Sequence, residues 1–473
     1  MSVTRVYNLG ELNLKISPFL TKDGSLLRCL NVERDAVGNY KKRRGYISYL
    51  GTPENAQVNS LFSWIRNDGT TFYNYRYANG KLYYSTQGTG AWTICGAGTL
   101  TASSYIGHEV IDDVMLIGDG TAPTRHTTTG TTFATTSGAT KSSQWIEFQG
   151  RAYGGRGTAN SGTDTNWFYS TTGTITDWTT DSSSIRIPGE GKILSVFKSS
   201  DRGIITKDTG AIFKWDGENL IDTVTNLGPS SPYSIASIEG YKLWLNRKGF
   251  YGFGGVRPEI VSNAIERIIY NDANTGIVGS QFDVAPAGIY KYDYYCAVGT
   301  VTDDLTGETI PDCVMKYNFQ DNEWANWRFA HFPTAFMTYK DASGDEQMVW
   351  GGTSGQCYQL AGTAVSDAGQ PIESVLEGVL SMEQPETDKK FNYIWAFSNP
   401  GCQAKIQVAV TDTFTKGKLN WIDLKQTKDG VMEARFPSGT QGKLLFWKLY
   451  EMSKDSRWVF YGFSVDWTPV LRT

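Results

Sequence analysis

The chain has 473 residues, of which 19% are charged and 13% aromatic, and 51 are glycines. This length exceeds one ordinary compact domain, and the composition is poor in helix formers but rich in strand and turn formers. It excludes a helical bundle and a doubly wound nucleotide-binding enzyme, and the 40% hydrophobic content excludes disorder. A net charge of −4 excludes a chain-wide basic field that would hold a nucleic acid.

The sequence predicts neither a membrane anchor nor a secretory signal, because no apolar run is long enough to span a bilayer and the start lacks a cleavable apolar core. Six cysteines are widely spread and none belongs to a CxxC pair. We expect free, buried thiols in a reducing compartment. Cys296 and Cys313 flank a predicted hairpin, but we do not expect a disulfide between them.

Residues 1–50 are predicted to form an N-terminal arm. Its residues 20–31 are a weak helix candidate, and residues 46–50 read as a strand. The clearest unit follows, with strands at 61–65, 71–77, 82–85 and 92–95. Asp68-Gly69 and Asn79-Gly80 occupy two of its turns, which is the strongest short-range signal for hairpins. These residues predict an antiparallel four-stranded meander.

The unit recurs along the chain as an aromatic strand, a turn of Gly, Asn or Asp, and usually a Trp that opens the next strand. Trp92, Trp178 and Trp324 are such tryptophans. Units start near residues 58, 102, 144, 191, 235, 285 and 334, so the period is about 42 to 50 residues. This period predicts a β-propeller over residues 51–363, with about seven four-stranded blades; six or eight stay open.

The seventh unit supplies only three strands, and we expect residues 46–50 to close the ring as its fourth. Within the fifth unit, Ser262 is a predicted N-cap for a short amphipathic helix that places Ile265, Ile268 and Ile269 on one face.

Residues 364–473 are predicted to form a C-terminal β-sandwich. Their strand-like runs are longer than those of the propeller and lie at 374–380, 390–397, 405–410, 444–450 and 458–465. The predicted fold class is therefore all-β, a propeller followed by a sandwich.

A series of short motifs in the N-terminal arm resembles a known family. The series comprises Leu9-Gly10-Glu11-Leu12-Asn13, Leu20-Thr21-Lys22-Asp23-Gly24-Ser25, Asn31-Val32-Glu33-Arg34-Asp35 and Gly38-Asn39-Tyr40-Lys41-Lys42-Arg43-Arg44-Gly45-Tyr46. It resembles the N-terminal region of tail hub and nozzle proteins of tailed bacteriophages, including the packaged-DNA stabilisation proteins. The helical stretch 260–265 and the step from residue 369 into the sandwich are also similar to that family. Arg43-Arg44 departs from the Arg-Pro step that is frequent there.

The resemblance implies a β-propeller protein that assembles as a homo-oligomeric ring, expected to be a hexamer, below the portal and adaptor of a virion. Such a ring docks to the portal-adaptor complex and other tail proteins, and it retains and conducts the genomic DNA during ejection. The implied location is the phage tail, after synthesis in the cytoplasm of the bacterial host. DNA passage would be transient and non-specific.

The basic run Lys41, Lys42, Arg43 and Arg44 is the one clear charge cluster. Three interpretations stay open: a solvated turn, a contact with a neighbouring subunit or the adaptor, and a contact with DNA. DNA is the least favoured, because each neutralised phosphate adds affinity that would slow passage. We take these four residues as a possible subunit or adaptor contact.

The sequence predicts no catalytic residue, cofactor or metal site, and hence no enzyme. His108, His126 and His331 lack metal-ligand spacing. Arg186-Ile187-Pro188 matches a three-residue piece of sialidases, but it lies in mid-chain and the repeated sialidase boxes are missing. The alternative to a tail protein is a propeller lectin or receptor-binding module for a surface glycan; a propeller glycosidase is a third, less favoured hypothesis.

Overall fold

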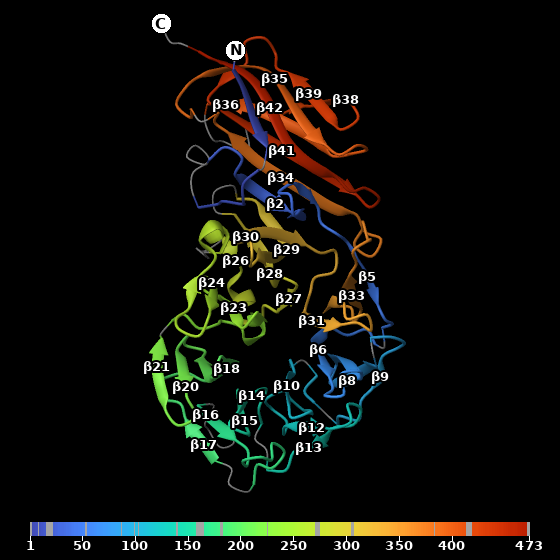
Figure 1. Ribbon diagram of the computed structural model, residues 1–473, viewed down its shortest axis with the longest axis vertical. Coiled ribbons are helices and arrows are strands. Elements are labelled where there is room, and N and C mark those ends of the chain that lie inside the picture. The colour runs from blue at the N-terminus through green and yellow to red at the C-terminus, as the bar shows by residue number, and fades with distance from the viewer. Residues whose placement is uncertain are drawn as a thin grey trace.

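The computed structural model describes residues 2–470 apart from residues 8, 16–21, 53, 87, 99, 103, 139–140, 158–164, 180–182, 225, 270–274, 304–306, 383 and 413–418. Strands dominate it, and they form a ring of antiparallel sheets with a sandwich at one side (Figure 1). The predicted fold class, an all-β chain with a propeller, is confirmed.

Six blades of the propeller are separate four-stranded antiparallel sheets. The first two are β6–β9 (Val58–Ile65, Phe72–Ala78, Lys81–Thr86, Thr93–Ile94) and β10–β13 (Gly107–Ile111, Val114–Gly118, Arg125–Thr127, Ala134–Thr135). The next two are β14–β17 (Gln144–Phe148, Arg151–Gly155, Asn166–Tyr169, Ser183–Arg186) and β18–β21 (Ile193–Ser199, Arg202–Lys207, Ile212–Trp215, Leu220–Val224). The fifth is β22–β25 (Ala236–Ile238, Tyr241–Asn246, Gly249–Phe253, Glu259–Ile260). The last is β31–β33 (Ala335–Lys340, Glu346–Gly351, Cys357–Leu360) with β5 (Tyr46–Tyr49) as its outer strand.

A further meander completes the ring between the fifth and the last of these blades. It consists of β27–β30 (Ala287–Tyr290, Asp293–Thr302, Thr309–Asn318, Glu323–Arg328), and β27 contacts both β22 and β31. Unlike the six blades, this meander belongs to a ten-stranded sheet that also includes β26 (Gly276–Ile277). The seven innermost strands begin within about five residues of the unit starts that the repeat predicts.

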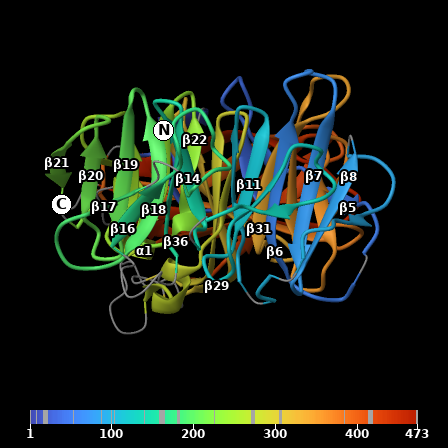
Figure 2. The ribbon, with the colours of Figure 1, turned by 90° about the horizontal axis from the view of Figure 1, so that it is seen from below.

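The sandwich is built from both ends of the chain. One of its sheets contains β1 (Ser2–Tyr7), β3 (Val32–Arg34), β4 (Tyr40–Lys42), β35 (Lys389–Ser398), β38 (Lys425–Lys428), β39 (Val431–Arg435), β40 (Gln441–Gly442) and β42 (Val459–Pro469). The other contains β2 (Leu26–Leu30), β34 (Ile372–Leu380), β36 (Lys405–Thr411), β37 (Ile422–Asp423) and β41 (Leu444–Ser453). Figure 2 shows the sandwich, in red and orange, behind the ring.

The second sandwich sheet is continuous with the propeller. Strand β2 pairs antiparallel with β34 of the sandwich and parallel with β30 of the ring, so one ten-stranded sheet crosses from one part to the other. The expectation of a helix at residues 20–31 is therefore wrong for its described part, because Leu26–Leu30 is a strand between two others. This pairing overrides a weak local preference for helix.

The predicted helix of the fifth unit is present as η2 (Asn263–Ile265) and α1 (Glu266–Ile269), with Ile265, Ile268 and Ile269 buried. Ser262 stands at its N-cap but makes no cap hydrogen bond, because its Oγ accepts from the Phe250 amide instead. Two further 3-10 segments are η1 (Pro232–Ser234) and η3 (Gly279–Asp283).

The aromatic residues fill the spaces between sheets. Separate hydrophobic clusters lie between neighbouring blades, and Trp64, Trp167 and Trp244 are completely buried in three of them. One larger cluster contains Trp350 of the last blade and Trp447 of the sandwich. Because a single core joins the two parts, packing as well as strand pairing holds the sandwich on the ring.

Candidate functional site: the junction of propeller and sandwich

The junction begins at Asn31, which follows β2 and has a left-handed backbone with φ of 54°. Asparagine tolerates this conformation better than most residues. Its Nδ2 donates to the Glu373 carbonyl (2.6 Å), and its Oδ1 accepts from the Arg328 amide (2.7 Å). The side chain thus joins the N-terminal arm, the end of β30 and the start of β34.

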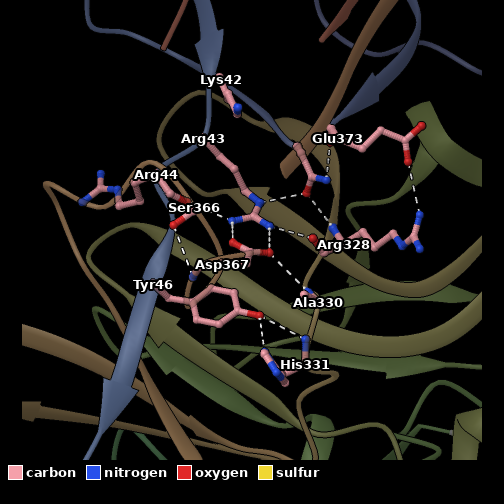
Figure 3. A network of polar contacts seen from close by, with 12 residues as sticks. Lys42, Arg43, Arg44, Tyr46, Arg328, Ala330, His331, Ser366, Asp367 and Glu373 are labelled. Atoms are coloured by element: carbon pink, nitrogen blue, oxygen red, sulfur yellow. Dashed lines mark hydrogen bonds and ion pairs between the residues drawn. The ribbon is translucent and has the colours of Figure 1, made fainter. Parts of the chain in front are cut away.

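Arg43 lies at the centre of the junction and is completely buried (Figure 3). Its Nε donates to Asn31 Oδ1 (2.8 Å), and its two terminal nitrogens donate to the two carboxylate oxygens of Asp367 (2.8 and 2.6 Å). The same nitrogens also donate to the carbonyls of Arg44 (2.9 Å) and Arg328 (2.7 Å). All five N–H groups of the guanidinium therefore have acceptors.

The Asp367 carboxylate binds the Arg43 guanidinium in a bidentate geometry, the strongest form of an arginine–carboxylate pair. Its Oδ2 also accepts from the Ala330 amide (3.2 Å). The guanidinium lies over the rings of Phe329 (4.8 Å) and Trp327 (5.4 Å). Three distant parts of the chain, the arm, the end of β30 and the linker after β33, meet on one buried ion pair.

A second buried ion pair lies next to the first. Lys42 Nζ is 2.6 Å from Glu451 Oε2 and donates to the Ser453 carbonyl (2.6 Å), and both charged side chains are almost completely buried. Ser374 Oγ donates to the Glu451 carbonyl (3.2 Å) and accepts from Trp458 Nε1 (3.1 Å). This pair fixes β4 against β41.

Tyr46 connects the junction to the closing blade. Its hydroxyl accepts from the His331 amide (3.0 Å) and lies 2.9 Å from Nδ1 of the same residue. The ring packs edge-on against Trp350 and Phe329 at centroid distances of 4.6 and 5.6 Å. Burial lowers the pKa of His331, and the nearby Asp367 carboxylate opposes this shift.

The prediction that the basic run contacts another subunit or the adaptor needs correction for two of its four residues. Lys42 and Arg43 are buried and paired with carboxylates of the same chain, so neither reaches a neighbouring surface. Burial of unpaired charge is costly, and these pairs explain how the run folds inward. Lys41 and Arg44 are half-exposed; Lys41 lies 3.5 Å from Glu33, and Arg44 lies over the Tyr290 ring.

The carboxylates Asp367, Glu373 and Glu451 were not singled out from the sequence. A basic run that is buried requires acidic partners, but the sequence does not show that the run is buried. Their positions, more than 300 residues further along the chain, carry no local signal.

The three histidines lie in separate parts of the structure. His331 belongs to the junction, His126 Nδ1 lies 3.0 Å from Thr136 Oγ1, and His108 stacks on Phe62. Within the described residues, no three His, Cys, Asp or Glu side chains are placed to hold a metal ion. No helix among them is long and apolar enough to cross a membrane.

Comparisons with known proteins give similarity in fold alone. No family profile matches the chain, and no curated protein matches its sequence. Among solved structures it is similar to the computationally designed Ika8 protein, with a TM-score of 0.36, 11% identity, and coverage of 67% of this chain and 99% of that one. It is also similar to the WD40 β-propeller domain of Doa1, with a TM-score of 0.29, 10% identity, and coverage of 67% and 97%. Scores this low carry no argument about function.

Proposed function

We propose that the chain is a structural subunit of a tailed-bacteriophage tail, a nozzle or hub protein that assembles as a homo-oligomeric ring. In this role it docks to the portal-adaptor complex and other tail proteins, and the lumen of the ring retains and conducts genomic DNA. Its work is mechanical rather than catalytic, and it is carried out in the virion.

The observation that supports this proposal is where the resembling motifs lie. Asn31 and Arg43 belong to the motif series, and their side chains join the sandwich to the propeller. Tyr46 of the same series connects this junction to the closing blade. Leu9 and Leu12 of the same series are buried in the core that the two parts share. Motif residues that hold the propeller and the sandwich together are consistent with a protein that transmits mechanical load between its neighbours in a tail.

The propeller's own channel does not serve as the DNA conduit in this proposal. The cavity at its centre has a volume of about 410 Å³, and the stacked rings of Tyr105 and Tyr233 (4.1 Å) line it at one end. Such a volume suits a small molecule rather than a duplex. The conduit would instead lie between copies of the chain, around the symmetry axis of the ring.

The proposal is tested by the oligomeric state of the purified full-length chain, alone and mixed with portal–adaptor complex, using mass photometry and negative-stain imaging. We expect closed rings; six copies of the 52.4 kDa chain would weigh about 314 kDa. A glycan array and a panel of glycosides are measured in parallel. A chain that stays monomeric under both conditions and binds a glycan saturably would overturn the proposal in favour of a lectin, and turnover of a glycoside would overturn it in favour of an enzyme.

A further inference from the structure

The centre of the propeller holds a continuous polar cavity. The space of about 410 Å³ and a neighbouring one of about 370 Å³ share six lining residues: His108, Glu109, Gln144, Val196, Phe197 and Lys242. These residues come from β10, β14, β18 and β23. The volume of either space falls in the range of small-ligand sites.

One end of this cavity is obstructed by aromatic side chains. Tyr105 and Tyr233 stack with centroids 4.1 Å apart, and both line the central cavity and a third space of about 330 Å³ beyond it. The stack therefore stands between the two spaces. Arg156 holds it, because its Nη1 donates to Tyr233 Oη (2.8 Å) and its guanidinium lies over the Tyr233 ring (4.9 Å).

Two opposite charges face the cavity without pairing with each other. The half-exposed Glu109 carboxylate makes no hydrogen bond or ion pair with a described residue. Lys242 Nζ donates to Ser237 Oγ and lies over the Phe197 ring (5.8 Å). Both side chains line the same two spaces, and each partly offsets the shift that desolvation causes in the pKa of the other, yet they form no ion pair.

We propose that this cavity binds a small zwitterion that carries an ammonium and a carboxylate, with the ammonium on Glu109 and the carboxylate on Lys242. The Gln144 amide, which lines both spaces, offers a donor and an acceptor between the two charges. Phe197 and Phe336 supply apolar wall for the rest of the ligand. A ligand with one charge would pair with only one of these two side chains and would leave the other charge without a partner.

The electrostatics of the cavity agree with this assignment. Desolvation raises the pKa of Glu109 to about 7, an effect that Lys242 and Lys198 oppose, and desolvation lowers the pKa of Lys242. Of the other charged groups that face Glu109, Glu147 and Lys198 already form an ion pair at 3.0 Å. Desolvation lowers the pKa of His108 to about 4, so this side chain is neutral near pH 7. Glu109 and Lys242 are thus the two charges left for a ligand.

The test is isothermal titration of the full chain near pH 8 with each of the common L-amino acids, with propylamine as an ammonium-only probe and propionate as a carboxylate-only probe. We expect at least one amino acid to bind with a Kd below about 1 mM, and both single-charge probes to bind at least about tenfold more weakly. Lowering the pH to about 6 should weaken binding, because Glu109 becomes protonated below its pKa.

The matched variants are Glu109→Gln and Lys242→Met, each expected to weaken binding by about tenfold or more. Glu218→Gln, in an outer turn, and Lys390→Met, in the sandwich, are exposed controls that should bind as the parent does. The proposal is overturned if no amino acid binds at about 10 mM, if the single-charge probes bind equally well, or if Glu109→Gln and Lys242→Met bind as the controls do. Ring assembly is a separate readout, so this result does not depend on the proposed tail function.

Discussion

At the scale of single residues, Arg43 is the side chain on which the junction depends most directly. Arg43→Met leaves the Asp367 carboxylate buried without its cation, and removal of one partner of a buried pair typically costs about 3–5 kcal/mol. Arg43→Lys should cost less, because the charge remains, but it loses the bidentate geometry. Urea denaturation measures the free energy of unfolding of both variants. The control is Arg44→Met, at a half-exposed position, and its free energy of unfolding should lie within about 1 kcal/mol of that of the parent.

A double variant separates the ion pair from mere packing. Arg43→Met combined with Asp367→Leu removes both charges, and it should recover part of the stability that Arg43→Met loses. This account of the pair would be contradicted if the double variant lost more free energy of unfolding than the two single variants lose together.

Gly45 is required because the backbone of the linker at Ser366 packs directly against it, and not because of its own backbone angle. A Cβ built there would lie 2.0 Å from the Ser366 carbonyl oxygen, a distance that no side chain can adopt without moving the linker. Gly45→Ala should therefore cost about 1–3 kcal/mol by overpacking. Gly51→Ala is a matched control in the same arm, because nothing lies within 4 Å of the Cβ position. Equal melting temperatures of the two variants would show that the linker yields freely.

The cysteines are expected to be unreactive in the native protein. All six are free and buried, and burial raises the pKa of each thiol, to about 12 for Cys29 and Cys296. Because the thiolate is the reactive form, a thiol reagent at about pH 8 should label none of them before unfolding and all six after denaturation. Rapid labelling of the folded protein would contradict the packing around them.

At the scale of secondary-structure elements, β5 is the strand that completes the last blade. Tyr46 anchors it, since its ring is buried among Trp350, Phe329 and Tyr358 and its hydroxyl binds His331. Tyr46→Ala should cost about 3–5 kcal/mol and Tyr46→Phe only about 1 kcal/mol, because the second change removes the hydroxyl alone. Hydrogen exchange of the β33 amides that face β5 should rise in Tyr46→Ala, and unchanged protection would mean that the blade does not need this anchor.

Most of the blade meanders could be predicted because their signals are local. Turns such as Asn79-Gly80 join neighbouring strands, and Asn79 indeed has a positive φ of 49°. Strands β1 to β4 of the arm were missed for the opposite reason, although β5 was predicted. Strand β1 pairs with residues 462–467 of β42, and nothing in a stretch of six residues identifies a partner so far away. The same applies to Asp367, whose role appears only once Arg43 is known to be buried.

At the scale of the whole molecule, the chain should unfold as one unit although it contains a propeller and a sandwich. The ten-stranded sheet crosses between the two parts, one hydrophobic cluster spans both, and the first and last strands of the chain pair with each other. Separate domains with a small polar interface would be expected to unfold independently. In this chain, unfolding of the propeller or of the sandwich would expose the hydrophobic core that the two share.

Differential scanning calorimetry tests this directly. The parent should show one transition whose calorimetric and van't Hoff enthalpies agree, if unfolding is reversible. Arg43→Met weakens the junction without touching blades one to four, so its thermogram should broaden or split as the sandwich detaches first. Arg44→Met should keep the single transition. Two separated transitions in the parent would mean that the shared sheet and the shared core do not couple the unfolding of the propeller and the sandwich.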